Sequence, residues 1–405
     1  MYPKLRFKGF DDAWEQRKLG EITGKVIGGG TPKTCVSEYW DGDIPWIQSS
    51  NVQENEMFDF DIPKSITQEG LEKSAAKLVP ENSIAVVTHV GVGKLVFVPF
   101  SYTTSQDFTS LSELKTDAQF TCYSLYQRIK NDLHIVQGSA IKGITKDDLL
   151  SKEIMVPEIQ EQRKIGNYFR KLDNLITLHQ RELDSLKKLK KSLLQKMFPK
   201  NGEKIPELRF PEFTGDWEQR KLSDYLFTSK EKNVNNKYGR KDVYSVSGEF
   251  GVVNQIEFQG RSFAGKTLDG YDVIHKGEVV YTKSPLKSNP YGIIKTNKRE
   301  TGIVSTLYAV YKPKDTCFAN FVEDYFNSDS RTNRYLSPLI SKGAKNTINV
   351  SDDKALDGIV IFPSTEEQRK ISTYFEKLNN LITLHQRELD TLKKLKKGLL
   401  QNMFV

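Results

Sequence analysis

Two stretches of the chain carry large apolar residues at spacings that alternate between four and three. The first stripe comprises Ile165, Phe169, Leu172, Ile176, His179 and Leu183. The second comprises Ile371, Phe375, Leu378, Ile382, His385 and Leu389. This heptad-like spacing predicts two helices of about 38 residues, each roughly 57 Å long. Because so narrow a stripe cannot bury itself, the helices are expected to pack on each other, antiparallel. The alternative is two separate helices that cap two separate domains.

Residues 20–156 and 223–362 show a different pattern, in which short β-branched and aromatic runs alternate with Gly, Pro, Asn and Asp. Strands are predicted in the runs 83–88, 94–98, 278–282 and 307–311. Short helices are expected at 119–131 and 318–329. Each of the two segments is therefore predicted to fold as a strand-rich α+β domain.

The chain also repeats itself, and this repeat organises the whole prediction. Residues 3–19 and 206–222 are identical at 11 of 17 positions. Residues 157–198 and 363–404 are identical at about three quarters of their positions, whereas the segments between these matches diverge. Two halves that keep one frame and differ in their variable domains suit a protein that recognises two different things in one geometry. The repeat further predicts chain termini that lie near each other.

The predicted fold class is α+β, with two strand-rich domains in a pseudo-twofold arrangement, separated by two long antiparallel coiled-coil-like helices. Four segments follow from the repeat. They are residues 1–156 (a joint and the first strand-rich domain), 157–199 (the first spacer helix), 200–362 (a joint and the second strand-rich domain) and 363–405 (the second spacer helix).

The composition limits the classes of partner and the cellular location that are expected for the chain. The formal net charge of +8 over 405 residues suits a polyanionic partner such as nucleic acid, although many basic proteins bind none. Three cysteines far apart in the sequence predict neither a disulfide framework nor a zinc site. The N-terminus lacks the apolar core of a signal peptide, and no apolar run approaches the ~18 residues that span a bilayer. A soluble cytoplasmic protein without a membrane partner is expected.

Polar groups suited to bases and phosphates are concentrated between the predicted strands. In the first domain the candidate DNA-binding residues are Thr31, Lys33, Ser49, Ser50, Asn51, His89, Lys94 and Lys142. In the second domain they are Lys230, Lys232, Ser245, Lys283, Ser284, Lys287, Asn289, Lys345 and Asn346. Lysines there would neutralise phosphates, and the uncharged polar side chains would contact base edges.

Several sequence features resemble nucleotide-binding, metal-binding or partner-binding sites. Residues 260–267 match the phosphate-binding loop pattern, but no helix is expected to follow them, as that loop requires. His179 and His385 are interpreted as packed polar residues at a helix crossing, not as metal ligands. The lysine runs at 187–191 and 393–397 are expected on the outer faces of the helices, either solvated or along phosphates or an acidic partner. No catalytic, cofactor-binding or metal-binding residue is predicted.

One family shares these features along essentially the whole chain. Residues 29–32 read Gly-Gly-Thr-Pro, and residues 38–47 read Glu-Tyr-Trp-Asp-Gly-Asp-Ile-Pro-Trp-Ile. The motif Glu-Gln-Arg-Lys-Ile opens each spacer helix, at 161–165 and 367–371. With two divergent domains and two near-identical helices, the chain resembles the specificity subunits of type I restriction-modification systems. The second domain lacks the opening motif of the first, which weakens the transfer of residue roles to it.

The resemblance implies a bacterial, DNA-associated protein that is not itself catalytic. Each domain would recognise one half of a bipartite target in double-stranded DNA, and the helices would set the gap. Two methyltransferase subunits would dock on the helices, where the stripe residues are also candidate subunit contacts, and on the domains. Two restriction subunits would join them, and these partners would carry the S-adenosylmethionine, ATP and Mg²⁺. The alternatives are a coiled-coil scaffold that binds proteins and a nucleotide hydrolase that uses Lys266.

Overall fold

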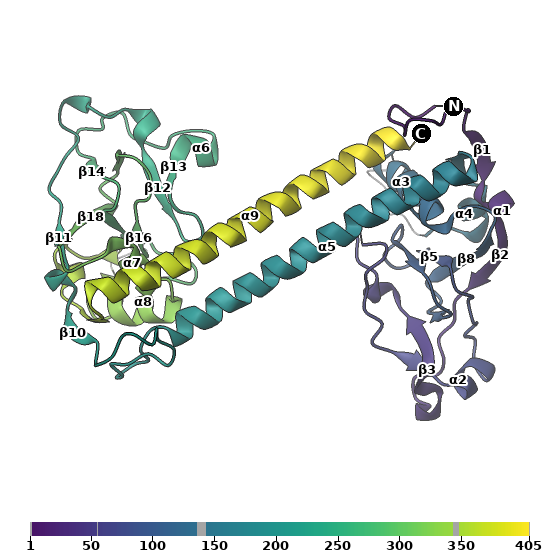
Figure 1. The fold of residues 1–405 in the computed structure, drawn as a ribbon, viewed down its shortest axis with the longest axis horizontal. Helices are drawn as coiled ribbons and strands as arrows, with labels where there is room; N and C mark the ends of the chain where they lie inside the picture. Colours follow the sequence, from purple (N-terminus) through teal and green to yellow (C-terminus); the bar gives the residue numbers. More distant parts are fainter. Residues whose placement is uncertain (1, 55, 136–142, 343–347, 405) are drawn as a thin grey trace. The chain divides into compact units, whose positions relative to one another are not determined.

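The chain divides into two compact units. The computed structural model describes residues 2–54, 56–135, 143–342 and 348–404. The first unit comprises Met1–Glu182 and His385–Val405, and the second comprises Leu183–Leu384. The boundary therefore falls inside both long helices, whereas the segments inferred from the sequence keep each helix whole. Both units combine helices with sheets, as the α+β prediction requires (Figure 1).

The first unit is built on a four-stranded antiparallel sheet in the order β2-β8-β5-β6. Its strands are β1 (Glu15–Lys18), β2 (Thr23–Gly28), β3 (Trp40–Ile47), β4 (Ser65–Ile66), β5 (Ser83–Val87), β6 (Leu95–Val98), β7 (Thr103–Thr104), β8 (Phe108–Leu114) and β9 (Glu153–Val156). Its helices are α1 (Leu19–Ile22), α2 (Gln68–Glu72), α3 (Ala118–Ile135), α4 (Lys146–Ser151), the first part of α5 (Ile159–Lys196) and the last part of α9 (Thr365–Met403). A second, three-stranded sheet has the order β4-β3-β7.

Strand β5 shows how these layers pack. Successive side chains of a strand point to opposite faces of the sheet. Ile84 and Val86 accordingly join a core with α3 and α5. Ala85 and Val87 join a second core with residues that follow β3. All five residues of β5 are buried, so the central strand is apolar on both faces.

The second unit repeats this plan although its sequence diverges. Its strands are β10 (Glu218–Lys221), β11 (Leu226–Thr228), β12 (Tyr244–Ser247), β13 (Gly251–Asn254), β14 (Asp272–Ile274), β15 (Val279–Thr282), β16 (Ile294–Thr296), β17 (Gly302–Val304), β18 (Tyr308–Pro313), β19 (Ser341–Lys342), β20 (Ile348–Asn349) and β21 (Ile359–Phe362). Its helices are α6 (Gln255–Gln259), α7 (Ala319–Tyr325), α8 (Asp329–Leu336), the last part of α5 and the first part of α9. The main sheet has the order β11-β18-β15-β16.

Both main sheets therefore have the same topology. In each, the strand that comes first in the chain (β2 or β11) pairs with the fourth (β8 or β18), which pairs with the second (β5 or β15), which pairs with the third (β6 or β16). The short helices also correspond, because α3 follows β8 and α7 follows β18. The strands predicted from apolar runs match β5, β6, β15 and β18 to within one or two residues. The helix expected at 318–329 is instead two short helices, α7 and α8, broken at residues 326–328.

The repeated sequence segments form the joint of each unit. In the first unit β1 pairs antiparallel with β9, and in the second β10 pairs antiparallel with β21. Arg6 donates twice to the carboxylate of Glu161, at 2.7 Å for both contacts. Arg209 does the same to Glu367, at 2.8 and 2.7 Å. Both carboxylates are essentially buried, so each joint contains one bidentate, charge-assisted pair.

The glutamine that follows each of these glutamates also has one role in both halves. Gln162 donates to the carbonyl of Pro157 and accepts from the Asp117 amide, at 2.7 and 2.8 Å. Gln368 donates to the carbonyl of Pro363 and accepts from the Phe318 amide, both at 2.9 Å. The shared Glu-Gln motif thus fixes the start of each long helix to its own domain.

The long helices bury the predicted stripe. Ile165, Phe169, Leu172, Leu183, Ile371, Phe375, Leu378 and Leu389 are buried, and Ile176, His179, Ile382 and His385 are partly buried. Within the first unit, Asp173 contacts Lys396 and His179 contacts His385, so these helix segments run antiparallel there. The Leu5 amide donates to the Asn402 carbonyl at 2.9 Å, so the two ends of the described chain are adjacent (Figure 1). Among the described residues, every helix is too short or too polar to cross a lipid bilayer.

Candidate nucleic-acid interface

In the first unit, several loops meet at one end of the main sheet, where β2 and β5 end and β8 begins. The Gly30 amide donates to the Thr104 carbonyl at 2.8 Å, and the Ser105 amide donates to the Ile47 carbonyl at 2.8 Å. These two bonds join the loop after β2, the loop after β3 and the loop before β8. We call this end of the sheet, in either unit, the interface end.

The turn between β5 and β6 belongs to the same surface. The Thr88 amide donates to the Asp107 carbonyl at 2.7 Å, and the Ile144 amide donates to the Thr88 carbonyl at 2.8 Å. His89 is exposed immediately after this anchor, and Lys94 lies at the other end of the turn. The structure thus collects polar groups from segments that are about 110 residues apart in sequence.

Most candidates of the first domain lie in these loops. Thr31 donates to the side chain of Gln106, across the interface end. Ser49, Ser50 and Asn51 form a short 3-10 turn directly after β3, where the Asn51 side chain accepts the Gln48 amide at 2.9 Å. Among the described candidates of the first domain, Lys33, Ser50 and His89 are exposed. Lys142 lies outside the described residues.

Steric crowding explains why glycine occupies the first two positions of the Gly-Gly-Thr-Pro motif. A Cβ at Gly29 would lie 1.9 Å from the Ser105 carbonyl oxygen, and one at Gly30 would lie 2.0 Å from that of Ala75. Only glycine permits such close approach of two backbones. The Trp46 indole then donates to the Gly30 carbonyl at 3.1 Å, which connects this loop to β3. The motif therefore positions the loop that carries Thr31 and Lys33.

In the second unit, lysines lie at the equivalent end of the sheet. Lys230 and Lys232 follow β11, and Lys283, Ser284 and Lys287 follow β15. The Lys283 amide donates to the Leu307 carbonyl at 2.8 Å, just before β18. That bond is the counterpart of the one between Thr88 and Asp107 in the first unit. The same strand ends thus carry the candidate residues in both units.

Acidic partners that the sequence analysis missed lie beside some of these lysines. The Lys232 ammonium lies 2.7 Å from Asp272, and the Lys283 ammonium lies 2.9 Å from Asp352. Burial raises the pKa of the Asp272 carboxyl, and the Lys232 contact opposes that rise. Part of the positive charge predicted from sequence is therefore neutralised within the protein.

Two other candidates of the second domain differ in their surroundings. Asn289 is buried, and its amide donates to Asp329 at 2.7 Å, so it stabilises the loop after β15. Ser245 lies on β12 and accepts from the Gln255 amide at 2.8 Å. Lys345 and Asn346 lie outside the described residues. Sequence alone does not distinguish Asn289 from its exposed neighbours, because all occupy one polar loop.

Contrary to the sequence prediction, the lysine runs do not lie entirely on the outer faces of the helices. Lys187, Lys188, Lys191, Lys393, Lys394 and Lys397 are exposed on the helices. Lys396 is instead buried, forms an ion pair with Asp173 and lies 5.6 Å from the centre of the Tyr123 ring. Its counterpart Lys190 is partly buried near Lys295, and desolvation lowers the pKa of the Lys190 ammonium. One lysine of each run thus packs against a unit and does not lie on an outer face.

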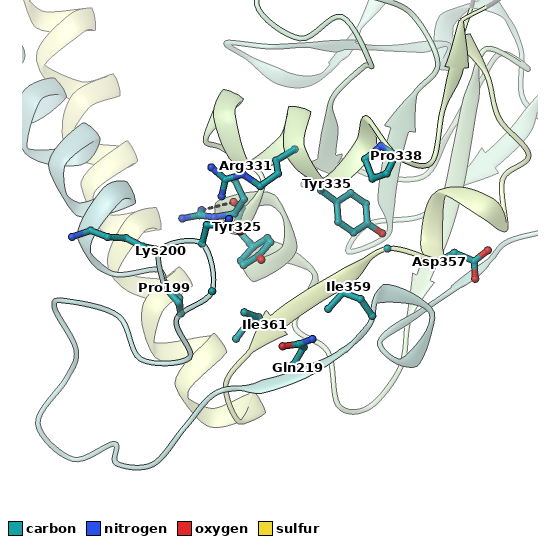
Figure 2. A pocket seen from close by; sticks show the side chains of 14 residues that line it. Pro199, Lys200, Gln219, Tyr325, Arg331, Tyr335, Pro338, Asp357, Ile359 and Ile361 are labelled. Carbon is teal, nitrogen blue, oxygen red and sulfur yellow. Dashed lines mark hydrogen bonds between the residues drawn. The ribbon is translucent and has the colours of Figure 1, made fainter.

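Two further features were weighed as sites. Residues 260–271 contain no helix, so the element that a phosphate-binding loop needs is missing from this segment. A cavity of about 510 Å³ lies in the second unit, beside the β10–β21 joint. Figure 2 shows the side chains that line it. Its Arg331 donates to the Tyr325 carbonyl at 2.7 Å and stacks over the rings of Tyr325 and Phe198. This guanidinium is already used in packing, and the cavity is lined by no residue of the interface end.

Comparisons with known proteins identify related sequences and a related fold. A family model described as type I restriction modification DNA specificity domain matches residues 11–188. A type I restriction enzyme specificity subunit from Methanocaldococcus jannaschii is 27% identical over 234 residues, which cover 55% of this chain and 53% of that protein. One from Escherichia coli is 31% identical over 186 residues, which cover 42% and 43%. The chain thus spans about half the length of these relatives.

A solved structure extends the likeness to the whole fold. The S subunit of a type I restriction-modification system from M. genitalium has a TM-score of 0.62 and 14% sequence identity, and covers 100% of this chain and 99% of its own. The family model covers the first strand-rich domain and most of α5, and the second unit repeats that domain's strand order and joint. Residues 11–188 therefore match the DNA specificity domain of type I restriction-modification systems, and the chain as a whole shares its fold with the S subunit from M. genitalium.

Proposed function

We propose that this chain recognises a bipartite target in double-stranded DNA, with each unit contacting one half of the target. The observation that carries the proposal is the repeated interface end. The two units differ in sequence, yet both place polar and basic side chains on loops at the same strand ends of the same sheet. Lysines there contact phosphates and fix the register, and Ser, Thr and His side chains contact base edges.

The long helices set the gap between the two half-sites. α5 has 38 residues and α9 has 39, without interruption. At ~1.5 Å per residue, each helix is about 57–59 Å long. A continuous helix whose two ends belong to different units is a stiff spacer. Pairing of the two helices along the apolar stripe, antiparallel over their whole length, gives the pseudo-twofold arrangement of the recognition domains.

Each helix also offers an apolar surface to a partner subunit. Leu175 and Leu178 on α5 are exposed, and so are Leu381 and Leu384 at the equivalent positions of α9. Because the same pair occurs on both helices, two copies of one partner can dock in the same way. We assign these positions to two methyltransferase subunits, and two restriction subunits complete the enzyme.

The chemistry resides in those partners. The specificity-subunit family is non-catalytic, and S-adenosylmethionine, ATP and Mg²⁺ are assigned to the methyltransferase and restriction subunits. This chain decides where adenine methylation and cleavage occur, and it acts in the bacterial cytoplasm on DNA.

The decisive experiment is methylome sequencing. A host that expresses the chain with its cognate methyltransferase subunit is compared with the same host that expresses the methyltransferase subunit alone. We expect one new adenine-methylated motif, split by a fixed number of unspecified base pairs. If the complex forms and no motif appears, the chain is a coiled-coil scaffold for protein partners. Purified complex would then bind DNA weakly and without sequence preference.

A further inference from the structure

Two histidines and two glutamates from the long helices meet inside the first unit. His179 and Glu182 lie on α5, and His385 and Glu388 lie on α9, at positions shifted by 206 residues. In each helix the sequence is His-Gln-Arg-Glu, and residues three apart lie on one face of a helix. The antiparallel segments therefore bring two identical His–Glu pairs face to face.

The cluster is compact. The Nδ1 atoms of His179 and His385 are 3.2 Å apart. Glu388 Oε2 lies 3.4 Å from His179 Nδ1 and 3.9 Å from His385 Nδ1. Glu182 Oε2 lies 3.3 Å from His385 Nδ1 and 3.8 Å from His179 Nδ1. Each carboxylate thus approaches both imidazoles, and the shorter contact always crosses to the other helix.

Ligand atoms of His179, His385 and Glu388 all lie within 4.8 Å of one another, and the measured separations can be compared with the edges of a coordination tetrahedron. Zinc binds imidazole nitrogen and carboxylate oxygen at about 2.0–2.2 Å, so neighbouring ligand atoms of a tetrahedral site lie about 3.3–3.5 Å apart. The three closest contacts of the cluster, at 3.2, 3.3 and 3.4 Å, lie at this spacing. The remaining two contacts, at 3.8 and 3.9 Å, come within it after small side-chain rotations.

We propose that the cluster binds one Zn²⁺ ion, through Nδ1 of His179 and His385 and the carboxylates of Glu182 and Glu388. Imidazole with carboxylate suits zinc and its first-row neighbours, whereas Mg²⁺ and Ca²⁺ prefer oxygen ligands alone. The imidazoles are about one-fifth exposed and the carboxylates somewhat less than half, so an ion reaches the site from solvent. Bound zinc ties α5 to α9 and fixes their register. This revises the interpretation of the two histidines as packing residues only.

The test uses the full-length chain after treatment with a chelator. Titration with Zn²⁺ in a calorimeter is expected to show one ion per chain. At a zinc concentration about a hundredfold above the Kd, the melting temperature should rise by about 5 °C or more. Co²⁺ in place of Zn²⁺ should give the intense visible absorption of a tetrahedral cobalt site. No step involves DNA, so failure here leaves the proposed function untouched.

Variants locate the ion. His179→Ala and His385→Ala should each weaken zinc binding at least tenfold. Glu182→Gln with Glu388→Gln preserves the shape of all four side chains and should weaken it as much, which guards against misfolding of the alanine variants. His275→Ala is the matched control, because His275 Nε2 lies 3.0 Å from a single glutamate, Glu231. The proposal is overturned if the wild type takes up no zinc. It is equally overturned if His179→Ala and His275→Ala bind zinc alike.

Discussion

Asp324 is a carboxylate that the fold places in the interior of the second unit. Burial, followed by the charge of Glu323, raises its pKa to about 7. The folded chain therefore keeps this proton at pH values where the unfolded chain, with an ordinary value of 3.8, has lost it. The stability contributed by the proton is complete below about pH 4 and is lost as the pH rises through 7.

Asp324→Asn should accordingly remove part of the pH dependence of stability. An amide has no proton to lose, so the variant should unfold with a free energy that changes less between pH 5 and pH 8. At pH 8 it should be more stable than the wild type by about 1–4 kcal/mol. Urea unfolding at several pH values measures both quantities, with exposed Asp269→Asn as the control. An unchanged pH slope in the Asp324 variant contradicts the assignment.

The buried ion pair of each joint is a second residue-scale feature. Arg209→Ala would leave the carboxylate of Glu367, which is 1% exposed, without its cation. Breaking such a pair costs about 3–5 kcal/mol. Arg220→Ala, which removes a pair whose side chains are 49% and 62% exposed, should cost less than about 1 kcal/mol. Equal losses for both variants in urea unfolding would show that the joint does not depend on the buried pair.

Lysines of the interface end should act on DNA affinity and leave sequence preference unchanged. Lys33→Ala in the complex with the methyltransferase subunit should weaken binding to all sequences alike. It should also reduce the slope of log affinity against log salt by about 1, because one phosphate contact is lost. Lys115→Ala is the matched control, since this exposed lysine lies at the other end of the same sheet, after β8. If both variants behave alike in a binding titration, the interface end is misassigned.

At the scale of the elements, the sequence predicted the long helices well because their apolar stripe occurs twice. Short strands such as β5 and β15 were also predicted, since each is a run of β-branched residues between turns. The environment of Lys396 was not predicted. Its Asp173 and Tyr123 partners lie 223 and 273 residues earlier, and no local pattern encodes such contacts. The same holds for Asn289, whose burial depends on Asp329 in α8.

The proposed spacer role of the helices leads to a prediction about length. Four residues inserted into α5 after Glu182 should lengthen that helix by ~6 Å and nearly preserve its phase. Since DNA rises ~3.4 Å per base pair, the methylated motif should keep its half-sites and widen its gap by one or two base pairs. Methylome sequencing of the variant reads this directly. An unchanged gap in a complex that still methylates would refute the spacer account.

At the scale of the whole molecule, the two units share a joint, a strand order and an interface end. A chain in which the second domain, residues 223–362, is replaced by a second copy of residues 20–156 should therefore fold. With one domain used twice around a pseudo-twofold axis, its methylated motif should become an inverted repeat of a single half-site. Methylome sequencing tests this, with the parent chain as control. A motif without inverted symmetry would mean that the halves are not related by such an axis.

The joint has a consequence for how such proteins diversify. The pairing of β1 with β9 and of β10 with β21 places the entry and exit of each recognition domain side by side on nearly identical framework. A different domain that is inserted between these two paired strands would be joined to the same Arg–Glu pair and the same helix start in either half. Specificity can then change when a whole strand-rich domain is exchanged, because the new domain needs no further substitutions to fit the joint.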